Sequence, residues 1–258
     1  MGEIISFSNQ KGGVGKTTTC VNVSAYLAKF GKKVLIVDMD PQGNATTGLG
    51  LDKSAVKSSV YNLLIDDASV YDVVQPTNVE NLDILPSSIE LAGAEVEIVY
   101  IPNREKKLFE KLSEIKDSYD YICIDCPPSL GLLTINALAA SDGVIIPIQC
   151  EYYALEGLSQ LMNSIKLVIK HLNKKLKIKG VSLTMFDGRA LVSKQIANEI
   201  RTYFDKSVFN TVVPRNIRVS EAPSHGVPVM MHDPKCAGAR AYHDLTKEIL
   251  ERSENYGG

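Results

Sequence analysis

Short apolar runs recur along the chain, and most are separated by segments with apolar residues at helical spacing. The runs cover residues 4–7, 34–38, 82–86, 119–125, 143–148, 180–184 and 209–213. Continuous apolar runs of about four to eight residues are typical of strands that are buried on both faces of a parallel sheet. The pattern therefore predicts an α/β fold with a twisted, mostly parallel sheet and helices on both of its faces.

The segments between the runs are expected to form helices over residues 19–28, 88–99, 105–115, 156–172, 193–204 and 239–252, with short ones at 60–64 and 70–74. In one of them Leu108, Leu112 and Ile115 share a face, as in an amphipathic helix. Residues 3–38 form a βαβ unit, which should be right-handed. No internal repeat or low-complexity linker interrupts the pattern, so residues 1–258 are expected to form a single domain.

A glycine-rich loop with two lysines, residues 8–18, lies between the first strand and the first helix. This order of strand, glycine loop and helix is the context that a phosphate-binding P-loop requires. Gly12, Gly13 and Gly15 allow positive φ and bring backbone N–H groups close to a phosphate chain. The helix that begins near Lys16 points the positive end of its dipole at the same anion, so the loop predicts a nucleotide site.

Two side chains of the loop have roles that follow from this chemistry. Lys16 supplies a point charge for the β- and γ-phosphates, and the Thr17 hydroxyl supplies a magnesium ligand. The plainest P-loop spacing would place a glycine at position 10, where this chain has Gln10, and Lys11 stands as a second lysine at the front of the loop. A glycine-rich turn with a structural lysine is the alternative, and the flanking strand and helix argue against it.

Acidic residues end two of the predicted strands. Asp38 and Asp40 follow the second strand, at the end of a parallel sheet where ligands bind, and both are expected to face the phosphate pocket. Asp125 ends an apolar strand in the manner of a Walker B motif and would hold magnesium through a water molecule. A core strand with a capping aspartate is the alternative for Asp125.

Composition narrows the class of protein. The hydrophobic content of 45% and the charged content of 22% are those of a soluble globular protein, and no apolar run approaches the roughly 20 residues that span a bilayer. Five scattered cysteines and the absence of a signal-peptide pattern favour a reduced, cytoplasmic protein. Cys123 and Cys126 resemble a metal or redox pair, but residues three apart on a strand face opposite sides, which favours the core.

Charge is distributed unevenly. Residues 1–129 hold 12 Lys/Arg and 18 Asp/Glu, a net of −6, and residues 130–258 hold 16 and 12, a net of +4. This asymmetry favours an anionic partner on the C-terminal half. Residues 166–179 carry six lysines and no acid, which fits either a solvated face or a nucleic-acid contact.

With these landmarks placed, the chain resembles the ParA/Soj family of chromosome and plasmid partitioning ATPases, and is most similar to its short Soj-like members. The family belongs to the deviant-Walker group of P-loop proteins. The matching segments follow the family's order over nearly the full length: residues 11–18, 37–44, 124–129, 147–157, 214–216 and 220–223.

The resemblance implies a weak ATPase that closes as an ATP-dependent sandwich dimer, with ATP and Mg²⁺ as cofactors. Its catalytic residues would be Lys11, which crosses to the partner's phosphates, Lys16, and Asp40, which orients the attacking water beside Asp38. Magnesium would be held by Thr17 and Asp125. The nucleotide contacts carried over are Lys11, Gly12, Gly13, Val14, Gly15, Lys16, Thr17, Thr18, Asp38, Asp40, Asp125, Pro214 and Asn216.

The resemblance also implies partners. Pro214 and Asn216 would contact the adenine, and Arg189 and Arg218 would bind double-stranded DNA without sequence preference. A ParB-like protein would stimulate hydrolysis, at a cytoplasmic, nucleoid-associated location and without a membrane. The alternatives are a MinD-like membrane ATPase, against which the acidic residues of segment 239–254 argue, an iron–sulfur carrier, and a small-molecule kinase or ligase.

Overall fold

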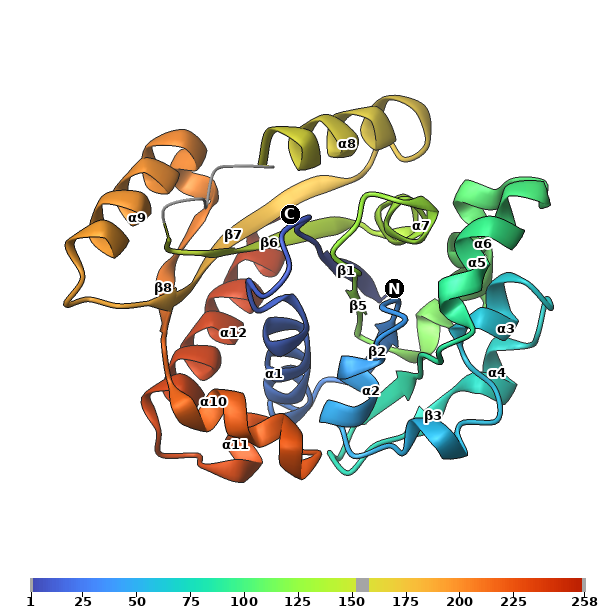
Figure 1. Ribbon diagram of the computed structural model, residues 1–258, viewed down its shortest axis with the longest axis horizontal. Helices are drawn as coiled ribbons and strands as arrows, with labels where there is room; N and C mark the ends of the chain where they lie inside the picture. Colours follow the sequence, from blue (N-terminus) through green and yellow to red (C-terminus); the bar gives the residue numbers. More distant parts are fainter. Residues whose placement is uncertain (1, 152–157, 257–258) are drawn as a thin grey trace.

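A single sheet of eight strands organises the computed structural model, which describes residues 2–151 and 158–256 (Figure 1). The strand order is β3-β4-β2-β5-β1-β6-β7-β8. The strands are β1 (Glu3–Phe7), β2 (Val34–Asp38), β3 (Gln75–Pro76), β4 (Leu82–Leu85), β5 (Tyr121–Asp125), β6 (Gly143–Gln149), β7 (Lys177–Phe186) and β8 (Val208–Pro214). Every neighbouring pair is parallel except β3 with β4, which confirms the predicted sheet.

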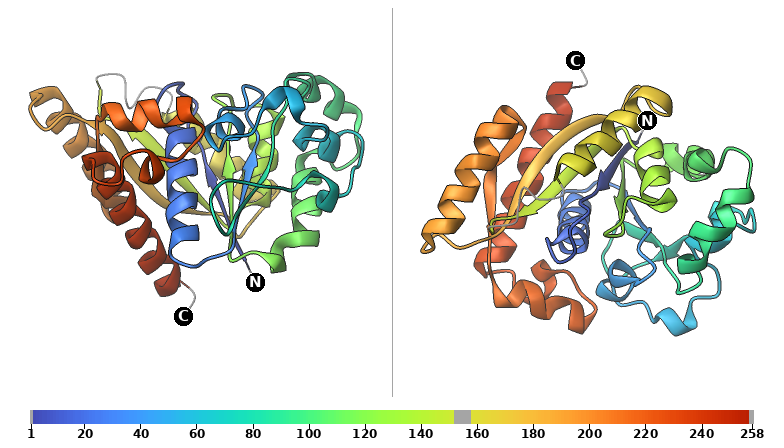
Figure 2. Two further views of the ribbon diagram at one scale, coloured as in Figure 1. Left: turned by 90° about the horizontal axis from the view of Figure 1, so that it is seen from below. Right: turned by 45° about the horizontal axis from the view of Figure 1, so that its top comes forward.

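Helices cover both faces of this sheet (Figures 1 and 2). On one face α1 (Lys16–Lys29) and α12 (Ala237–Tyr256) share a core with inward residues of β1, β2 and β5. The opposite face carries α3 (Val60–Leu64), α4 (Val70–Val73), α5 (Leu91–Glu97), α6 (Lys107–Ile115), α7 (Leu132–Ala140), α8 (Leu158–His171) and α9 (Leu191–Phe204). The short helices α2 (Asn44–Gly48), α10 (Ile217–Glu221) and α11 (Val229–His232) pack against the same core as α1 and α12, through Ala45, Val219 and Val229.

Short 3₁₀ turns connect many of these elements: η1 (Lys53–Ala55), η2 (Ile98–Tyr100), η3 (Arg104–Lys106), η4 (Lys116–Ser118), η5 (Asp205–Ser207) and η6 (Ala222–His225). Within residues 2–151 and 158–256, no helix has both the length and the apolarity to cross a bilayer.

The cysteine pair, Cys123 in β5 and Cys126 directly after it, is part of the core. Cys123 packs with α1 and α12, whereas Cys126 packs with the helices of the opposite face, as expected for residues three apart on an extended chain. Both thiols are free and buried. Among the described residues no group of three or more His, Cys, Asp or Glu could hold a metal ion.

The short elements β3, α2, α10 and α11 were not predicted from the sequence, and three longer segments also differ from the prediction. Helix α7 was not predicted, because most of its residues are apolar and buried and it therefore lacks a helical period. The first two residues of the predicted helix 156–172 lie outside the described part of the chain. Residues 152–157 of the motif 147–157 lie outside it too. The lysine-rich run 166–179 is not one face: it passes from α8 through a turn into β7, where Lys179 is buried and paired with Glu3.

Candidate nucleotide site

The P-loop lies at the carboxyl end of β1 and opens α1. Gly13 and Gly15 have φ values of +73° and +83°, in the left-handed region where a side chain would be strained. Gly15 is also the residue that caps the N-terminus of α1. The helix therefore starts with backbone N–H groups directed toward the loop, as a phosphate site requires.

Neighbouring strands hold the loop in this shape. The Thr184 hydroxyl on β7 donates to the Val14 carbonyl at 2.8 Å, and Val14 is buried. The Asn9 amide donates to the Pro147 carbonyl on β6 at 2.7 Å, while its oxygen accepts from the Lys11 N–H at 3.1 Å. Sequence reasoning missed Asn9 and Thr184, because their partners are distant along the chain.

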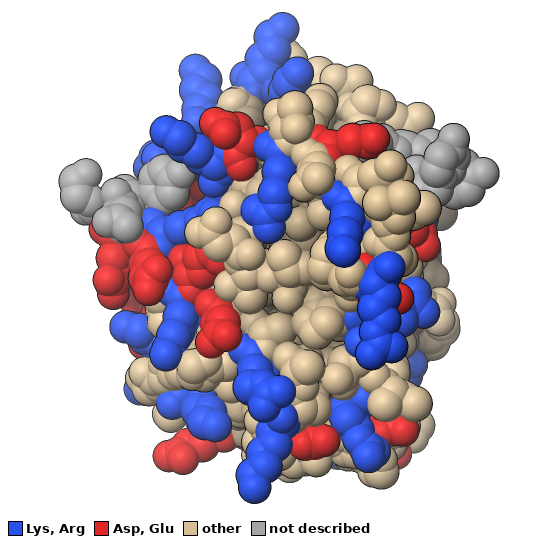
Figure 3. Space-filling view, turned by 90° about the vertical axis from the view of Figure 1, so that its left-hand side faces the viewer, with Lys and Arg blue, Asp and Glu red and all other residues tan. Residues whose placement is uncertain are grey.

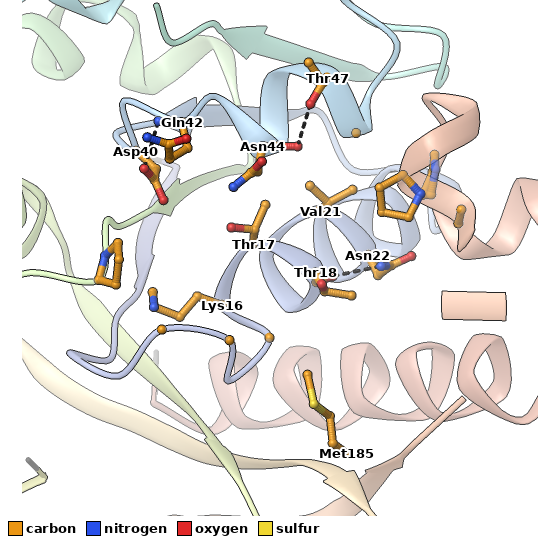
Figure 4. Close-up of a pocket in the computed structure, with 18 of the residues that line it drawn as sticks. Lys16, Thr17, Thr18, Val21, Asn22, Asp40, Gln42, Asn44, Thr47 and Met185 are labelled. Carbon is orange, nitrogen blue, oxygen red and sulfur yellow. Dashed lines mark hydrogen bonds between the residues drawn. The ribbon is translucent and has the colours of Figure 1, made fainter. Parts of the chain in front are cut away.

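A cavity of about 450 Å³ opens in front of the loop. Its lining combines Gly12, Gly13, Gly15, Lys16, Thr17 and Thr18 of the loop with Asp40, Gln42, Asn44 and Thr47 of the β2–α2 segment and Pro128 after β5. Figure 4 shows Lys16, Thr17 and Asp40 directed into the same space from two different elements. The structure therefore brings Lys16, Thr17 and Asp40 to one cavity, whereas Asp125, the second predicted metal ligand, is not among the residues that line it.

Lys16 is buried in this site, with 6% of its surface exposed, and its Nζ donates to the Lys11 carbonyl at 2.9 Å. It makes no ion pair within the part of the chain that the structure describes. Burial lowers the pKa of Lys16, and the nearby Asp125 and Asp40 act in the opposite direction. A buried cation without a carboxylate partner is costly, and an anionic ligand would remove that cost.

Asp125 is the complementary case at the end of β5. It is fully buried, and neither carboxyl oxygen has a hydrogen-bond partner among the described residues. Burial and then the charge of Asp38 raise the pKa of Asp125 well above its usual range, while Thr17 and Lys16 act in the opposite direction. A buried carboxylate with free oxygens beside a threonine hydroxyl suits a hard cation, so Asp125 and Thr17 fit magnesium.

Asp38 is Asp125's register partner on β2, but its surroundings are different. Its carboxylate accepts from the Thr46 N–H at 2.8 Å, the Thr46 hydroxyl at 2.7 Å and the Asp40 N–H at 3.2 Å. Burial raises the pKa of Asp38 to about 6. Asp40 lines the cavity and Asp38 does not, which corrects the expectation that both face it. Asp38 instead positions the segment that carries Asp40, through its hydrogen bonds to Thr46 and Asp40.

Ser87 completes this arrangement and was also missed from the sequence. Its hydroxyl donates to the Asp40 carbonyl at 2.7 Å, and its N–H donates to the Thr46 hydroxyl at 3.0 Å. Thr46 and Ser87 are both fully buried polar residues. They connect the β2–α2 segment to the chain that follows β4, so the Asp40 side chain is placed by two neighbouring elements.

Comparisons with known proteins agree with this geometry. A family model described as an AAA domain matches residues 2–178. The sporulation initiation inhibitor protein Soj of Bacillus subtilis (strain 168) is 59% identical over 249 residues, which cover 96% of this chain and 98% of Soj. The chain belongs to the Soj/ParA family of chromosome partitioning ATPases. This confirms the resemblance found in the sequence.

Solved structures show that the fold is that of P-loop nucleotide-binding proteins. A cobyrinic acid a,c-diamide synthase from Mycobacterium smegmatis, with bound ADP and magnesium, is 33% identical with a TM-score of 0.88, and covers 98% of this chain and 96% of that one. The septum site-determining protein MinD of Pyrococcus horikoshii OT3, complexed with Mg-ADP, is 29% identical with a TM-score of 0.80, and covers 98% of both chains.

Lys11 is the second lysine of the loop, and the plainest P-loop pattern does not require it. In this chain its Nζ contacts the carboxylate of Glu151, which follows β6. The side chain of Lys11 is 30% exposed, so it lies at the mouth of the loop rather than inside it. Any reach toward a second chain first requires separation of the Lys11–Glu151 pair.

Pro214 and Asn216, the predicted adenine contacts, line a second cavity of about 180 Å³. This cavity shares Gly15, Thr18 and Met185 with the first one, so the two adjoin. The Asn216 side chain also caps α10 by accepting from the Arg218 N–H at 3.0 Å. The structure thus places both residues next to the phosphate cavity.

The two predicted DNA-binding arginines of this Soj/ParA chain differ in their pairing. Arg189 is exposed after β7 and has no carboxylate partner among the described residues. Arg218, on α10 after β8, lies 2.9 Å from Glu221 and 3.7 Å from Asp233. Both follow carboxyl ends of strands, as the P-loop does. Figure 3 shows that basic and acidic side chains are mixed on the face beside these elements.

Proposed function

We propose that the chain is a single-domain partitioning ATPase that binds ATP and Mg²⁺ and hydrolyses ATP slowly. It would work as an ATP-dependent sandwich dimer on DNA. The observation that carries this proposal is a pair of buried charges that lack ion-pair or hydrogen-bond partners of opposite charge among the described residues. Lys16 lines the P-loop cavity, and Asp125, which is not part of that lining, is close enough for its charge to act on the pKa of Lys16. An ATP phosphate chain and a magnesium ion are the two groups whose charges satisfy both. Solved relatives that hold nucleotide and magnesium support it.

The phosphates would be bound by the loop N–H groups, by the N-terminus of α1 and by Lys16. Thr17 and Asp125 would hold magnesium, which supplies charge neutralisation at the β- and γ-phosphates when it is bound. Asp40 is hydrogen-bonded to the Gln42 N–H at 3.0 Å and lines the cavity, so it would orient the attacking water. The adjoining cavity at Pro214 and Asn216 would take the adenine.

A second chain would complete the site. Lys11 stands at the mouth of the cavity and would reach the partner's phosphates, in the manner of an arginine finger supplied in trans. Dimerisation would bring Arg189 and Arg218 of both chains onto one surface for DNA. Such binding is mainly phosphate neutralisation, so it falls steeply with salt. A ParB-like partner would stimulate hydrolysis and release, at a cytoplasmic, nucleoid-associated location.

The experiment that tests this function measures ATP turnover and light scattering on the wild-type chain and on Lys11→Ala. We expect slow turnover that rises when DNA and a ParB-like protein are added, and a dimer that forms only with ATP. Lys11→Ala should keep monomer nucleotide binding and lose the dimer. An ATP-dependent dimer of Lys11→Ala, or a wild-type chain without ATP turnover, would contradict the proposal.

The MinD-like alternative is disfavoured by the last helix. Tyr242, Leu245 and Ile249 of α12 are buried in the core with α1, so this apolar face already has a partner within the chain. A membrane-lying helix needs its apolar face free. Co-sedimentation with anionic liposomes in the presence of ATP would reveal a MinD-like activity if it exists.

A small-molecule ligase is a second candidate, because the chain is 33% identical to the diamide synthase. The higher identity to Soj, 59%, favours the partitioning ATPase. ATP turnover without any organic acceptor distinguishes the two, because a ligase couples hydrolysis to acceptor amidation.

A further inference from the structure

Glu95 of α5 lies against the loop that follows β5. An added Cβ at Gly131 would be 2.0 Å from the Glu95 Oε1 atom and 2.7 Å from its Cδ atom. The φ of Gly131 is −77°, which any residue can adopt, so the close approach of Glu95, and not the backbone conformation, requires glycine here. Gly131 therefore marks a direct contact between α5 and this loop.

The carboxylate of Glu95 has no partner that would explain it as part of α5 alone. Its Oε1 atom is buried and accepts no hydrogen bond from the described residues. The nearest basic residue along the chain, Arg104, donates instead to the Val99 carbonyl at 2.6 Å and to the Glu105 carboxylate at 3.0 Å. A buried carboxylate oxygen without a donor is costly, so its role is to be sought in the element that it faces.

The element that Glu95 faces is the start of α7. Gly131 is the N-cap residue of this helix, no side chain caps it, and its first turn contains no acidic residue. The Thr134 hydroxyl of that turn donates to the Ser129 carbonyl at 2.7 Å. The first N–H groups of a helix lack partners within it, and a carboxylate beside them is favourable. Glu95 thus supplies from α5 the negative charge that the first turn of α7 lacks.

The loop between β5 and α7 borders the nucleotide cavity. It is held at its start, where the Cys126 N–H donates to the Phe7 carbonyl of β1 at 3.2 Å. It is held at its end by the contact between Glu95 and Gly131. Pro128, between these two points, lines the cavity. The position of Pro128 beside a bound nucleotide therefore depends on Glu95.

The same segment of the chain supports the other side of the cavity. The Ser87 hydroxyl donates to the Asp40 carbonyl at 2.7 Å, and the Asp40 side chain lines the cavity. Leu91, between Ser87 and Glu95, is fully buried and fixes the segment in the core. Residues 87–95 thus connect the segment that carries Asp40 with the loop that follows β5.

We infer that Glu95 is a positioning residue for ATP hydrolysis, an inference that rests on the proposed function. Its carboxylate holds the loop after β5 in place, while Ser87 holds the segment that carries Asp40. Glu95 itself does not line the cavity, so its loss changes the geometry of the reacting groups rather than the contacts that bind ATP. A misplacement of about 1 Å can lower a rate roughly 100-fold.

The first test compares Glu95→Ala with the matched control Glu97→Ala, which removes an exposed carboxylate from the same helix. ATP turnover and ATP affinity are measured on the full chain. Glu95→Ala should lower kcat roughly tenfold and leave the ATP dissociation constant within about twofold, whereas Glu97→Ala should change neither. A wild-type kcat in Glu95→Ala, or an equal loss of kcat in both variants, would overturn the inference.

The contact itself is tested by Gly131→Ala. The added methyl group should displace the end of the flexible Glu95 side chain, so the variant is expected to fold and to lose as much kcat as Glu95→Ala. In the Glu95→Ala background the same change should cause no further loss, because the effects of residues in direct contact are not additive. An equal loss from Gly131→Ala in both backgrounds would exclude the contact as the cause.

A tryptophan in the loop reports on its position directly, because the chain contains no other tryptophan. In Ser129→Trp with Mg²⁺ and a non-hydrolysable ATP analogue, acrylamide quenching should rise about twofold when Glu95→Ala is added, because a loop held at one end opens more often. Adding Glu97→Ala should leave the quenching unchanged. Unchanged quenching in Glu95→Ala would overturn the inference. This measurement needs no hydrolysis, so a wild type without ATP turnover would contradict the proposed function alone.

Discussion

The two ends of the sheet each bury a lysine, and the two lysines are stabilised in different ways. At the amino end Lys179, 5% exposed, contacts the Glu3 carboxylate and donates to the Ser253 hydroxyl at 2.6 Å. At the carboxyl end Lys16 is 6% exposed, but among the described residues it donates only to the backbone carbonyl of Lys11. Burial lowers the pKa of both amines. A buried cation with its counter-ion in the chain is structural, and one without it is a binding group.

The buried aspartates repeat the contrast within one end of the sheet. Asp38 and Asp125 are adjacent in register on β2 and β5. The chain satisfies Asp38 through Thr46 and Asp40, whereas it leaves both oxygens of Asp125 without a donor among the described residues. Neighbouring carboxylates of the same burial thus serve as a structural support and as a candidate metal ligand. The pairing of a buried charge, more than its burial, separates the two roles.

The largest expected effect is a difference between the two lysines: replacing Lys16 should reduce ATP affinity, and replacing Lys179 should reduce stability. Lys16→Ala should weaken ATP binding by roughly 100-fold or more, because it removes one member of a buried charge pair in the complex. Lys179→Ala should leave ATP affinity unchanged and lower the free energy of unfolding by about 3 kcal/mol, because Glu3 loses its partner. Calorimetric titration and denaturant unfolding measure the two quantities. Similar effects of both variants on ATP affinity would contradict the assignment of Lys16 as a binding group and Lys179 as a structural one.

Asp125→Asn should weaken metal binding and, without metal, make the folded chain more stable. Metal affinity in the presence of ATP should fall roughly 10- to 100-fold. Without metal the variant should be more stable than the wild type at neutral pH, because the raised pKa of Asp125 disfavours its charged form in the folded state. The free energy of unfolding of the wild type falls as pH rises from the pKa of an aspartate in the unfolded chain, about 4, through the raised pKa of Asp125 in the folded chain. The variant has no carboxyl at this position and does not show this loss.

Denaturant midpoints from pH 4 to 8 in a chelating buffer measure this difference. The exposed Asp117 of η4 provides a control substitution, Asp117→Asn, which should follow the wild-type pH dependence. A wild type that gains stability relative to Asp125→Asn as pH rises would show that Asp125 is not an unsatisfied buried carboxylate.

The two arginines extend the comparison to the surface. Arg189→Ala should weaken DNA binding about tenfold at low salt and reduce the salt slope by about one, the value for one lost phosphate contact. Arg218→Ala should have the smaller effect, because Glu221 and Asp233 already neutralise part of its charge. Fluorescence anisotropy with a DNA duplex in a salt series tests this, with exposed Lys33→Ala at the amino end as control. Equal losses for all three variants would remove the special role of the arginines.

The smallest expected effect concerns Lys11. Glu151→Gln removes the charge that holds Lys11 within its own chain. Because partly exposed pairs are worth about 0.2–1 kcal/mol, the ATP-dependent dimer should tighten by only about 1.5- to 5-fold. The matched control Glu199→Gln removes an exposed carboxylate of α9 and should leave the dimer constant unchanged. Analytical ultracentrifugation with ATP measures the dimer constant, and an equal gain in both variants would exclude the Lys11–Glu151 pair as its cause.

The sequence predicted those features that depend on neighbours along the chain. Strands and amphipathic helices have a period of their own, and the loop from Lys11 to Thr18 combines its glycines and lysines in one stretch. Helix α7 has no such period, since most of its residues are buried. The turn of Asp38 toward Thr46, and the support of the loop by Thr184, depend on contacts that only the folded chain creates.

The Lys179 amine, which contacts both Glu3 and Ser253, has a consequence for protein engineering. Glu3 comes from the first strand and Ser253 from the last helix, and they meet at the amino end of the sheet, whereas the P-loop lies at the carboxyl end. A short linker between them would span only a small distance, and circular permutation is best tolerated where chain ends are close. A permuted chain opened in a surface turn would allow a reporter to be placed beside α5 or beside the DNA-facing loops at will.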